Sequence, residues 1–383
     1  MKSPVKIFSA LVAVVIAIVV ILILFMAYDS EKVTRWLAEQ GVATAQNDLG
    51  YIYKHGSKNT PQDYEKARYW FRLSADRGNA SAQNNLGYTY MHGLGVSQNY
   101  GQALYWFRLA AEQRSARAQN NLGRMYQDGL GVPQNYGQAI RWYRLAAAQW
   151  LEAAQVNLGN MYFDGLGVSQ NYEQAVYWYR LAAERGDSTG RTHLGYMYLH
   201  GLGVSQDYAQ AEHWYRLAAD QGNAWAQVEL GFMYYLGSGV FQDYEQAADW
   251  FRLAAEQGDV TGGIHLGYMY FHGLGVPQNH RQAVRWYRLA AEQGDMTGEA
   301  HLGYMYLHGL GVSQNSRRAA HWYRLAAEQG DPWAQTELGF MYYMGLGVPQ
   351  DYEQAEYWFR LAEEANSDEG LLSFDLIIPT SGF

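Results

Sequence analysis

Cysteine is absent from this chain of 383 residues, which excludes a disulfide framework and any thiolate metal or redox site. Proline is scarce at 7 residues, whereas glycine, tyrosine and tryptophan reach 41, 33 and 13 residues, an imbalance typical of one unit copied many times. A surplus of basic residues is also missing. The formal net charge is −9 and no basic face stands out, so the sequence argues against a nucleic-acid partner.

Catalytic signatures are missing as well. The chain has no H-E-x-x-H zinc motif and no Walker phosphate loop. Ser3 and Lys6 fit the S-x-x-K pattern of serine β-lactamases, but no S-D-N or K-T-G partner follows, and we interpret the match as coincidence. The sequence therefore predicts no enzyme, no catalytic residue and no cofactor.

Histidines are the most tempting metal ligands. Three repeats carry one histidine before a Leu-Gly pair and another two helical turns later: His193 and His200, His265 and His272, His301 and His308. Two turns separate the members of a pair by about 10.5 Å, whereas a histidine nitrogen binds zinc at about 2.1 Å. Because one ion cannot bridge that gap, we predict no metal site and interpret the histidines as part of a polar surface stripe.

One long apolar run, residues 7–28, stands near the start of the chain. As a helix it would reach about 33 Å, enough to cross a hydrocarbon core of about 30 Å. We therefore predict a transmembrane signal anchor at 7–28, with a short cytoplasmic leader at 1–6, a linker at 29–40 and the remaining chain outside, in a bacterium in the periplasm. A cleaved signal peptide is the alternative, but its apolar region is usually shorter, about 7–15 residues.

A Leu-Gly pair recurs through the rest of the chain at intervals of 36 residues, after a first interval of 37. The pairs begin at Leu49, Leu86, Leu122, Leu158, Leu194, Leu230, Leu266, Leu302 and Leu338. Such a period indicates an all-α solenoid. We predict nine repeats within 41–365, at 41–77, 78–113, 114–149, 150–185, 186–221, 222–257, 258–293, 294–329 and 330–365. Residues 366–383 are interpreted as a cap that shields the last repeat, with a partner-binding tail as the alternative.

Each repeat has the pattern of two helices. In the second repeat, apolar and small residues recur at helical spacing around Leu86, and Asn99 stands at the N-cap of the next helix. Gly87 lies inside the first helix, where glycine is costly, so we expect an aromatic ring of the Trp106 or Phe107 class to approach it closely. Most repeats end in glycine, but Arg114 and Trp150 stand there instead, and we expect those two junctions to bend differently.

The consensus A-Q-x-x-L-G-x-x-Y, G-L-G-V-x-Q-[DN]-Y and Q-A-x-x-W-[YF]-R-L-A-A-E-x-G resembles the Sel1-like repeat family, which is similar to tetratricopeptide repeats. The resemblance implies a right-handed superhelix of antiparallel helix pairs that serves as an adaptor or scaffold for other proteins. A cysteine-rich branch of the family is linked to penicillin binding and β-lactamase activity. This chain departs from that branch because it has no cysteine. The first repeat, with SKNTPQDY in the loop, departs from the consensus as a terminal repeat would.

Three positions of the predicted first helix vary between repeats: the residue before each Leu-Gly pair, the residue three later and the residue four earlier. These offsets share one helix face, which lines the concave side of tetratricopeptide-like arrays. We predict a partner-binding groove formed by Arg117, Asn121, Arg124, His193, Tyr196, Trp225, Glu229, Phe232, His265, Tyr268, His301, Tyr304, Trp333, Glu337 and Phe340. The alternative is that the tyrosines pack between neighbouring first helices and the groove is merely solvated.

A groove of aromatic rings and adaptable polar groups suits an extended peptide or a glycan. We interpret the chain as a membrane-anchored adaptor or scaffold of the bacterial envelope that binds peptide segments or protein partners in this groove. Two alternatives remain open. One is a cell-wall or glycan binder that uses the tryptophan and tyrosine rows, and the other is a penicillin-interacting, β-lactamase-like envelope protein.

Overall fold

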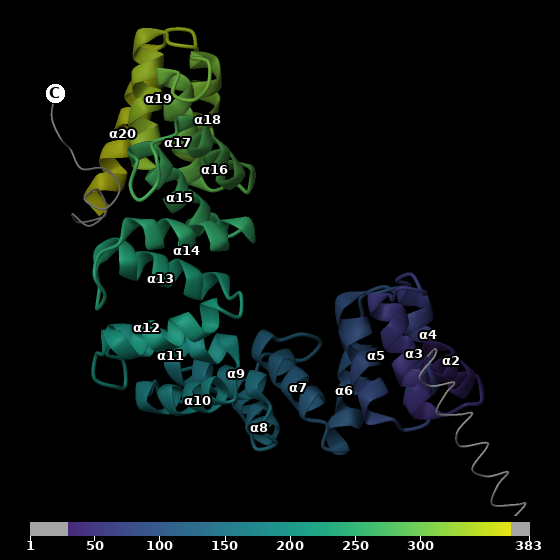
Figure 1. Cartoon of the computed structure of the whole chain (residues 1–383). Coiled ribbons are helices and arrows are strands. Elements are labelled where there is room, and N and C mark those ends of the chain that lie inside the picture. The colour runs from purple at the N-terminus through teal and green to yellow at the C-terminus, as the bar shows by residue number, and fades with distance from the viewer. Residues whose placement is uncertain (1–29, 369–383) are drawn as a thin grey trace, which may run out of the picture. The chain divides into compact units, whose positions relative to one another are not determined.

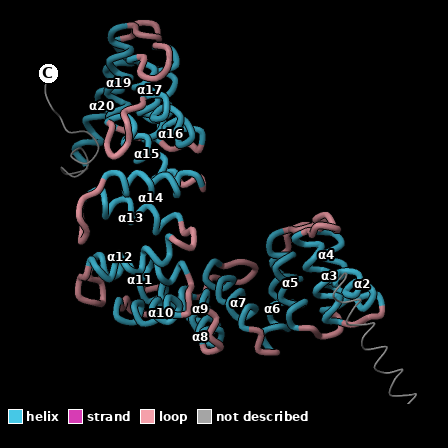
Figure 2. Tube along the Cα trace, in the orientation of Figure 1, coloured by secondary structure: helices cyan, strands magenta, loops and turns pink. Residues whose placement is uncertain are grey.

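The computed structural model describes residues 30–368, which form helices and loops and no strand (Figure 1 and Figure 2). The helices are α2 Ser30–Glu39, α3 Ala43–His55, α4 Tyr64–Ala75, α5 Ala80–His92, α6 Tyr100–Glu112, α7 Ala116–Asp128, α8 Tyr136–Ala147, α9 Glu152–Asp164, α10 Tyr172–Glu184, α11 Ser188–His200, α12 Tyr208–Ala219, α13 Ala224–Leu236, α14 Tyr244–Glu256, α15 Val260–His272, α16 His280–Glu292, α17 Met296–His308, α18 Ser316–Glu328, α19 Pro332–Met344 and α20 Tyr352–Asp368. The all-α prediction is confirmed for this part of the chain.

From α3 onward the helices pair as the repeats predict, odd-numbered helices first and even-numbered helices second, and each pair packs on the next within its unit. Two compact units result. The N-terminal unit ends at Arg185 and contains α2 to α10, and the C-terminal unit begins at Gly186 and contains α11 to α20. Asparagine or aspartate caps the second helices from α4 to α18, as when the Asn99 Oδ1 accepts from the backbone N of Gln102 at 2.9 Å.

The glycine inside each first helix makes room for an aromatic ring, as predicted. A Cβ atom on Gly87 would lie 2.7 Å from Cδ1 of Phe107, whose side chain is fully buried. The ring is that of Phe107 and its equivalents, such as Tyr287 against Gly267, and Trp106 lies outside this contact. Close approach of the two helices therefore explains a glycine that intrinsic helix propensity disfavours.

A second glycine brings neighbouring repeats into backbone contact. Gly95, in the loop after α5, has a φ of 64°, and a Cβ there would lie 2.5 Å from the carbonyl carbon of Tyr64 in the preceding repeat. Side chains are disfavoured at this φ and would also collide with that backbone. The G-L-G motif of the loops therefore encodes stacking between repeats, which a local turn alone does not require.

Polar side chains add specific bonds between consecutive repeats. The buried Gln83 on α5 donates from Nε2 to the carbonyl of Ala75 on α4 at 3.2 Å. The arginine that follows the paired aromatics donates to a tyrosine hydroxyl one repeat later, as Arg144 Nη2 does to Tyr162 at 2.7 Å. Bonds of these two kinds tie a repeat to its neighbour near the start and near the end of the first helix.

The expectation that the junctions at Arg114 and Trp150 differ from the others is wrong. Their φ angles are 64° and 65°, in the left-handed region that Gly222 occupies with 84° at an equivalent junction. The bonding also matches, since the backbone N of Arg114 donates to Ala111 O at 2.9 Å and that of Gly222 to Ala219 O at 2.9 Å. The stacking imposes this conformation, and the two side chains tolerate the strain.

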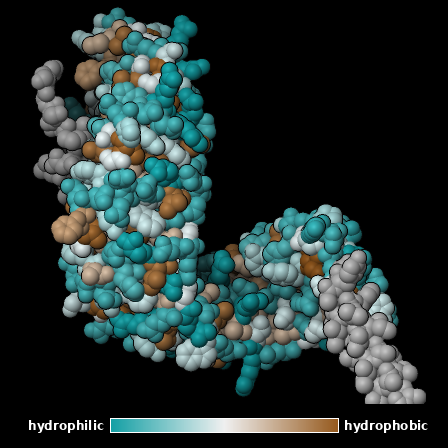
Figure 3. Space-filling view, in the orientation of Figure 1, coloured by the Kyte–Doolittle hydropathy of each residue, from teal (hydrophilic) through white to brown (hydrophobic). Residues whose placement is uncertain are grey.

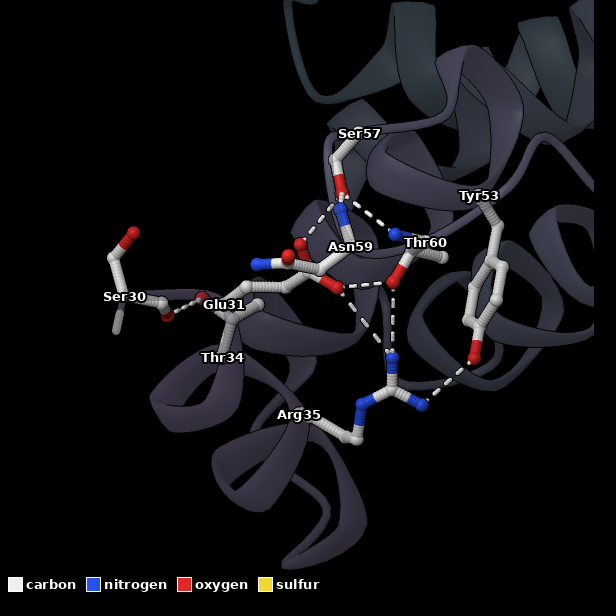
Figure 4. Close-up of polar contacts among 8 residues, drawn as sticks. All are labelled: Ser30, Glu31, Thr34, Arg35, Tyr53, Ser57, Asn59 and Thr60. Atoms are coloured by element: carbon white, nitrogen blue, oxygen red, sulfur yellow. Dashed lines mark hydrogen bonds and ion pairs between the residues drawn. The ribbon is translucent and has the colours of Figure 1, made fainter. Parts of the chain in front are cut away.

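The predicted linker at 29–40 is also wrong, because Ser30–Glu39 forms α2, which packs on α3 and buries Val33 and Ala38. Figure 4 shows the polar contacts around this helix. Glu31 accepts hydrogen bonds from Ser57, at 2.6 Å, and from Thr60. Arg35 donates to the hydroxyl of Tyr53 at 2.9 Å.

The contacts of Glu31 explain why the first repeat departs from the loop consensus, since Ser57 and Thr60 belong to its SKNT segment. The hydrogen bond from Ser57, followed by that from Thr60, lowers the pKa of Glu31, so the carboxylate stays charged. α2 thus covers the side of the first repeat on which no preceding repeat packs.

Two predictions fall outside this range. The predicted membrane anchor at 7–28 and the tail beyond Asp368 lie outside the described residues. Within residues 30–368, none of the helices has the length and apolar character that crossing a membrane requires.

Candidate functional site

All fifteen predicted groove residues lie on first helices, where four are exposed (Arg117, Arg124, Trp225 and Phe340) and the other eleven are partly buried. They come from α7 (Arg117, Asn121, Arg124), α11 (His193, Tyr196), α13 (Trp225, Glu229, Phe232), α15 (His265, Tyr268), α17 (His301, Tyr304) and α19 (Trp333, Glu337, Phe340). The face in Figure 3 is a mosaic of hydrophilic and scattered hydrophobic residues in both units. The structure thus leaves this row accessible, but the two units use it differently.

The C-terminal unit brings the predicted residues together in two matching clusters, which are 108 residues apart in the sequence. In the first cluster, the rings of His193 and Trp225 lie 5.1 Å apart, and Trp225 Nε1 donates to Glu229 at 2.9 Å. In the second cluster, His301 and Tyr304 lie 5.4 Å and 5.8 Å from Trp333. The tyrosines therefore do pack between neighbouring first helices, and they still line the accessible face.

The histidines of this face are neutral and oriented by the backbone. Nδ1 of His301 lies 2.8 Å from the carbonyl oxygen of Thr297, and Nδ1 of His265 lies 2.8 Å from that of Thr261. Burial lowers the pKa of His301 and of His193 to about 4, and it also lowers the pKa of His265. Because a carbonyl only accepts, Nδ1 carries the proton and Nε2 is left as a hydrogen-bond acceptor.

The carboxyl groups of the two clusters are perturbed in the opposite sense. Burial raises the pKa of Glu229, and the hydrogen bond from Trp225 opposes this shift. The pKa of Glu337 is raised by burial in the same way. Burial thus favours the protonated form of both carboxyl groups relative to that of an exposed glutamate.

Two cavities open beside the second cluster. One, of about 160 Å³, is lined by Tyr268, Phe271, His272, Tyr287, His301, Tyr304, Met305 and Trp333. The other, of about 250 Å³, is lined by Phe232, Tyr235, Leu236, Ile264, His265, Tyr268 and His301. The two share Tyr268 and His301 and are lined by residues of α13, α15, α16, α17 and α19, and we call the pair the double cavity.

The N-terminal unit uses the same face for bonds between its own helices. Asn121 Nδ2 donates to Asn84 at 2.9 Å, and Asn157 Nδ2 donates to Asn120 at 2.8 Å. The cavity of about 360 Å³ in this unit is lined mainly by asparagine, serine and Arg117. Asn121 therefore has a structural role, whereas Arg117 and Arg124 are exposed and lie outside the double cavity.

Sequence reasoning missed several residues that line the double cavity, above all Tyr287, Phe271 and Tyr235. Tyr287 belongs to the aromatic position that packs against the first-helix glycine, and core packing explains its burial. The signal was the alternation at that position between phenylalanine, as at Phe251, and tyrosine. A core position needs no hydroxyl, so its presence in some repeats points to a local polar role.

The histidines of the described residues do not gather into a metal site. The residues that the structure describes contain no group of three or more histidine, aspartate or glutamate side chains placed to hold one ion. The histidines at the ends of the first helices instead lie against a tyrosine one turn earlier, as His308 does with its ring 4.3 Å from that of Tyr304 and tilted to it.

Stacked helix pairs with an accessible face of rings define a helical-repeat scaffold. The chain belongs to the Sel1 repeat family, whose repeat matches residues 43–79, 80–115, 116–149, 152–187, 190–223, 226–259, 264–295, 298–331 and 334–367. This confirms the family and the nine repeats. Proteins of this family are generally non-catalytic scaffolds for protein interaction.

Two solved structures are similar to the chain. A protective antigen present in uropathogenic Escherichia coli strains is 36% identical over 88% of this chain and 81% of that chain, with a TM-score of 0.53. A Sel1 repeat protein from Oxalobacter formigenes is 32% identical over 81% of this chain and 90% of that chain, with a TM-score of 0.63. No curated protein matches the chain significantly.

Proposed function

We propose that this Sel1-repeat protein is an adaptor whose C-terminal unit binds an extended peptide segment of a protein partner along its first helices. The observation that carries the proposal is the double cavity, which lies on the face of α13, α15, α17 and α19. Rigid aromatic rings there offer large contact areas at a low cost in conformational entropy, which is how protein interfaces anchor a few side chains of a partner.

We further propose that residues 7–28 anchor the adaptor in a bacterial membrane, with the repeats on the periplasmic side. The support is the length of the uncharged apolar run. α2 follows this segment closely and is bonded to the first repeat through Glu31 and Arg35. Such an arrangement would hold the first repeat next to the membrane surface, which a long flexible linker would not do.

Site-specific photocrosslinking in cells tests the groove. A photoreactive phenylalanine analogue at Tyr268 or Trp225 should trap the same protein partner, and the same analogue at Tyr357 should not. Tyr357 is a matched control because it is 43% exposed, compared with 37% for Trp225, but lies on the second helix α20. Equal yields of one species from all three positions, or only unrelated abundant proteins, would contradict the proposal.

Fractionation tests the anchor. The full chain should sediment with membranes and resist extraction by salt, and a variant that begins at residue 29 should be released into the soluble fraction. Protease added to intact spheroplasts should digest the repeats. Protection of the repeats in intact spheroplasts would contradict the predicted orientation.

A further inference from the structure

The hydroxyl of Tyr287 is an unsatisfied polar group in the wall of a cavity. Its side chain is 1% exposed, and its hydroxyl has no hydrogen-bond partner among the described residues. The residue also lines the cavity of about 160 Å³. Tyr215 and Tyr323 have unpartnered hydroxyls too, but neither lines the double cavity. Buried hydroxyls normally have a partner, so this one needs an explanation.

The N-terminal unit shows what a satisfied hydroxyl looks like at the same position. Tyr143 donates to Gln127 at 2.7 Å, and Tyr179 donates to Asn160 at 2.8 Å. At the two positions that correspond to Gln127 and Asn160, the repeat of Tyr287 carries Phe271 and Tyr268. Tyr268 shares a hydrogen bond with Tyr235 in the second cavity. The substitutions that build the aromatic walls are therefore those that leave Tyr287 without a partner.

Tyr287 can act as a donor towards the cavity. Burial, and then the nearby Tyr268, raise the pKa of the Tyr287 hydroxyl, which keeps it protonated. The Tyr287 hydroxyl is enclosed in this structure, so a ligand reaches it only if a neighbouring ring moves, and Tyr268 in the same wall is partly exposed. His301, in the same wall, presents Nε2 as an acceptor because its Nδ1 is bonded to Thr297. Tyr287 and His301 thus supply one donor and one acceptor, and the other polar side chains of the lining are those of Tyr268, His272, Tyr304 and Trp333.

The size and charge of the cavity limit which chemical group can occupy it. A cavity of about 160 Å³ holds one aromatic ring, since an apolar cavity of about 150 Å³ admits benzene. Its lining contains no Asp, Glu, Lys or Arg, so nothing there pairs with a charged group. It also contains no Asn or Gln, the side chains whose paired donor and acceptor could bind two neighbouring hydroxyls of a sugar ring. We therefore consider a neutral ring whose single hydroxyl reaches Tyr287 and His301.

We propose that this cavity binds the phenol ring of a tyrosine in the partner peptide, whose hydroxyl donates to Nε2 of His301 and accepts from the hydroxyl of Tyr287. This proposal rests on the proposed adaptor function and specifies which side chain of the partner the cavity binds. Phenylalanine would fill the same volume and leave both polar groups of the wall unpaired. The site therefore selects tyrosine over phenylalanine, by the same principle with which buried polar groups reject a ligand that lacks a hydroxyl.

Two small probes test the selectivity on the full chain in detergent: N-acetyltyrosinamide and N-acetylphenylalaninamide. The reporter is the ¹³C-methyl NMR signal of Met305, which lines the cavity and is identified by its loss in Met305→Leu. The tyrosine probe should shift this signal and bind about tenfold more tightly than the phenylalanine probe, the effect of one or two neutral hydrogen bonds. Equal affinities, or no shift with the tyrosine probe, would overturn the proposal.

Two variants test the mechanism. Tyr287→Phe retains the ring that packs on Gly267 and should remove most of the tenfold preference without weakening the phenylalanine probe. Tyr268→Asn reproduces the Asn160–Tyr179 pair, so it should give Tyr287 an internal partner and weaken both probes. The matched control Tyr179→Phe, in the N-terminal unit, should change neither affinity. A preference that survives Tyr287→Phe would show that the hydroxyl does not select the ligand.

A third probe, N-acetylglucosamine, distinguishes a glycan site. A shift of the Met305 signal by this sugar, with none by the tyrosine probe, would replace the peptide anchor by a sugar subsite. The outcomes also separate the tyrosine selectivity of the cavity from the adaptor function. A partner trapped at Tyr268 together with no preference for the tyrosine probe would refute the tyrosine selectivity alone. A preference for the tyrosine probe with no trapped partner would refute the adaptor function.

Discussion

The N-terminal and C-terminal units share one fold but assign opposite roles to the first-helix face. In the N-terminal unit, the asparagine before the Leu-Gly pair is bonded to the preceding first helix, as Asn85 is to Asn47 and Asn121 to Asn84. In the C-terminal unit the position of Asn84 is taken in several repeats by residues such as Val228 and Ile264, whose side chains cannot accept a hydrogen bond. The face then turns aromatic and opens into the double cavity. Where these amide side chains are absent, the first-helix face is not used for bonds between helices and remains available for a partner.

Deleting a core side chain should show whether the two units also unfold separately. Leu122 and Leu302 are fully buried at equivalent positions of the two units. Leu122→Ala should destabilise the N-terminal unit by about 3 kcal/mol, because it loses buried area and leaves a cavity. Hydrogen exchange should accelerate in α5 to α8 and stay unchanged in α15 to α18. Leu302→Ala should give the reverse pattern, and equal acceleration in both units would refute the comparison.

Mild acid should weaken the C-terminal unit before the N-terminal unit. His193 and His301 have a pKa of about 4 in the folded chain, compared with about 6.5 when unfolded. Between these values the unfolded state binds more protons, so stability falls as pH falls from about 6.5 towards 4, by up to about 3 kcal/mol for each histidine. The raised pKa values of Glu229 and Glu337 oppose this loss, since protonation relieves their burial.

In the N-terminal unit, Glu31 has a lowered pKa, so its contribution is present above the unfolded value and is lost only as pH falls through the lower folded value. Denaturant titrations from pH 7 to 4.5, read by hydrogen exchange in each unit, measure this difference. His301→Asn with His193→Asn should flatten the response of the C-terminal unit. An unchanged pH dependence in that variant would contradict the assignment.

The tyrosine hydroxyls provide a matched pair of conservative changes. Tyr179→Phe should cost about 1 kcal/mol, because it breaks the bond to Asn160. Tyr287→Phe should leave stability unchanged or raise it, because its hydroxyl has no partner to lose. Urea denaturation of the two single variants measures both effects, and a loss of the same size in Tyr287→Phe would mean that this hydroxyl is bonded.

The smallest expected effect concerns the junctions. Arg114→Gly should stabilise the N-terminal unit by about 0.5 kcal/mol, since relief of the left-handed strain outweighs the added freedom of the unfolded chain. Gly222→Ala, at an equivalent junction of the C-terminal unit, should be destabilising because its φ is 84°. Thermal unfolding of both variants tests this, and a loss of stability in Arg114→Gly would show that the arginine side chain contributes more than its backbone costs.

The sequence by itself determined the repeat, the order of its helices, the glycine against a ring and the helical face that varies. These features depend on local spacing, and a pattern copied along the chain makes local spacing readable. It did not reveal α2 within 29–40, because one short helix carries no repeat signature and is held by Glu31 and Arg35 through contacts with a distant loop.

Only the tertiary structure decided which predicted residues act together. Asn121 and His301 occupy the same position of their repeats, yet one bonds a neighbouring helix and the other lines a cavity. The difference arises from residues on the adjacent repeat, which the helical period of a single segment cannot register. Tyr287 shows the same limit. Its burial follows from the repeat pattern, but its hydroxyl lacks a hydrogen-bond partner because Phe271 and Tyr268 stand where other repeats carry an amide side chain.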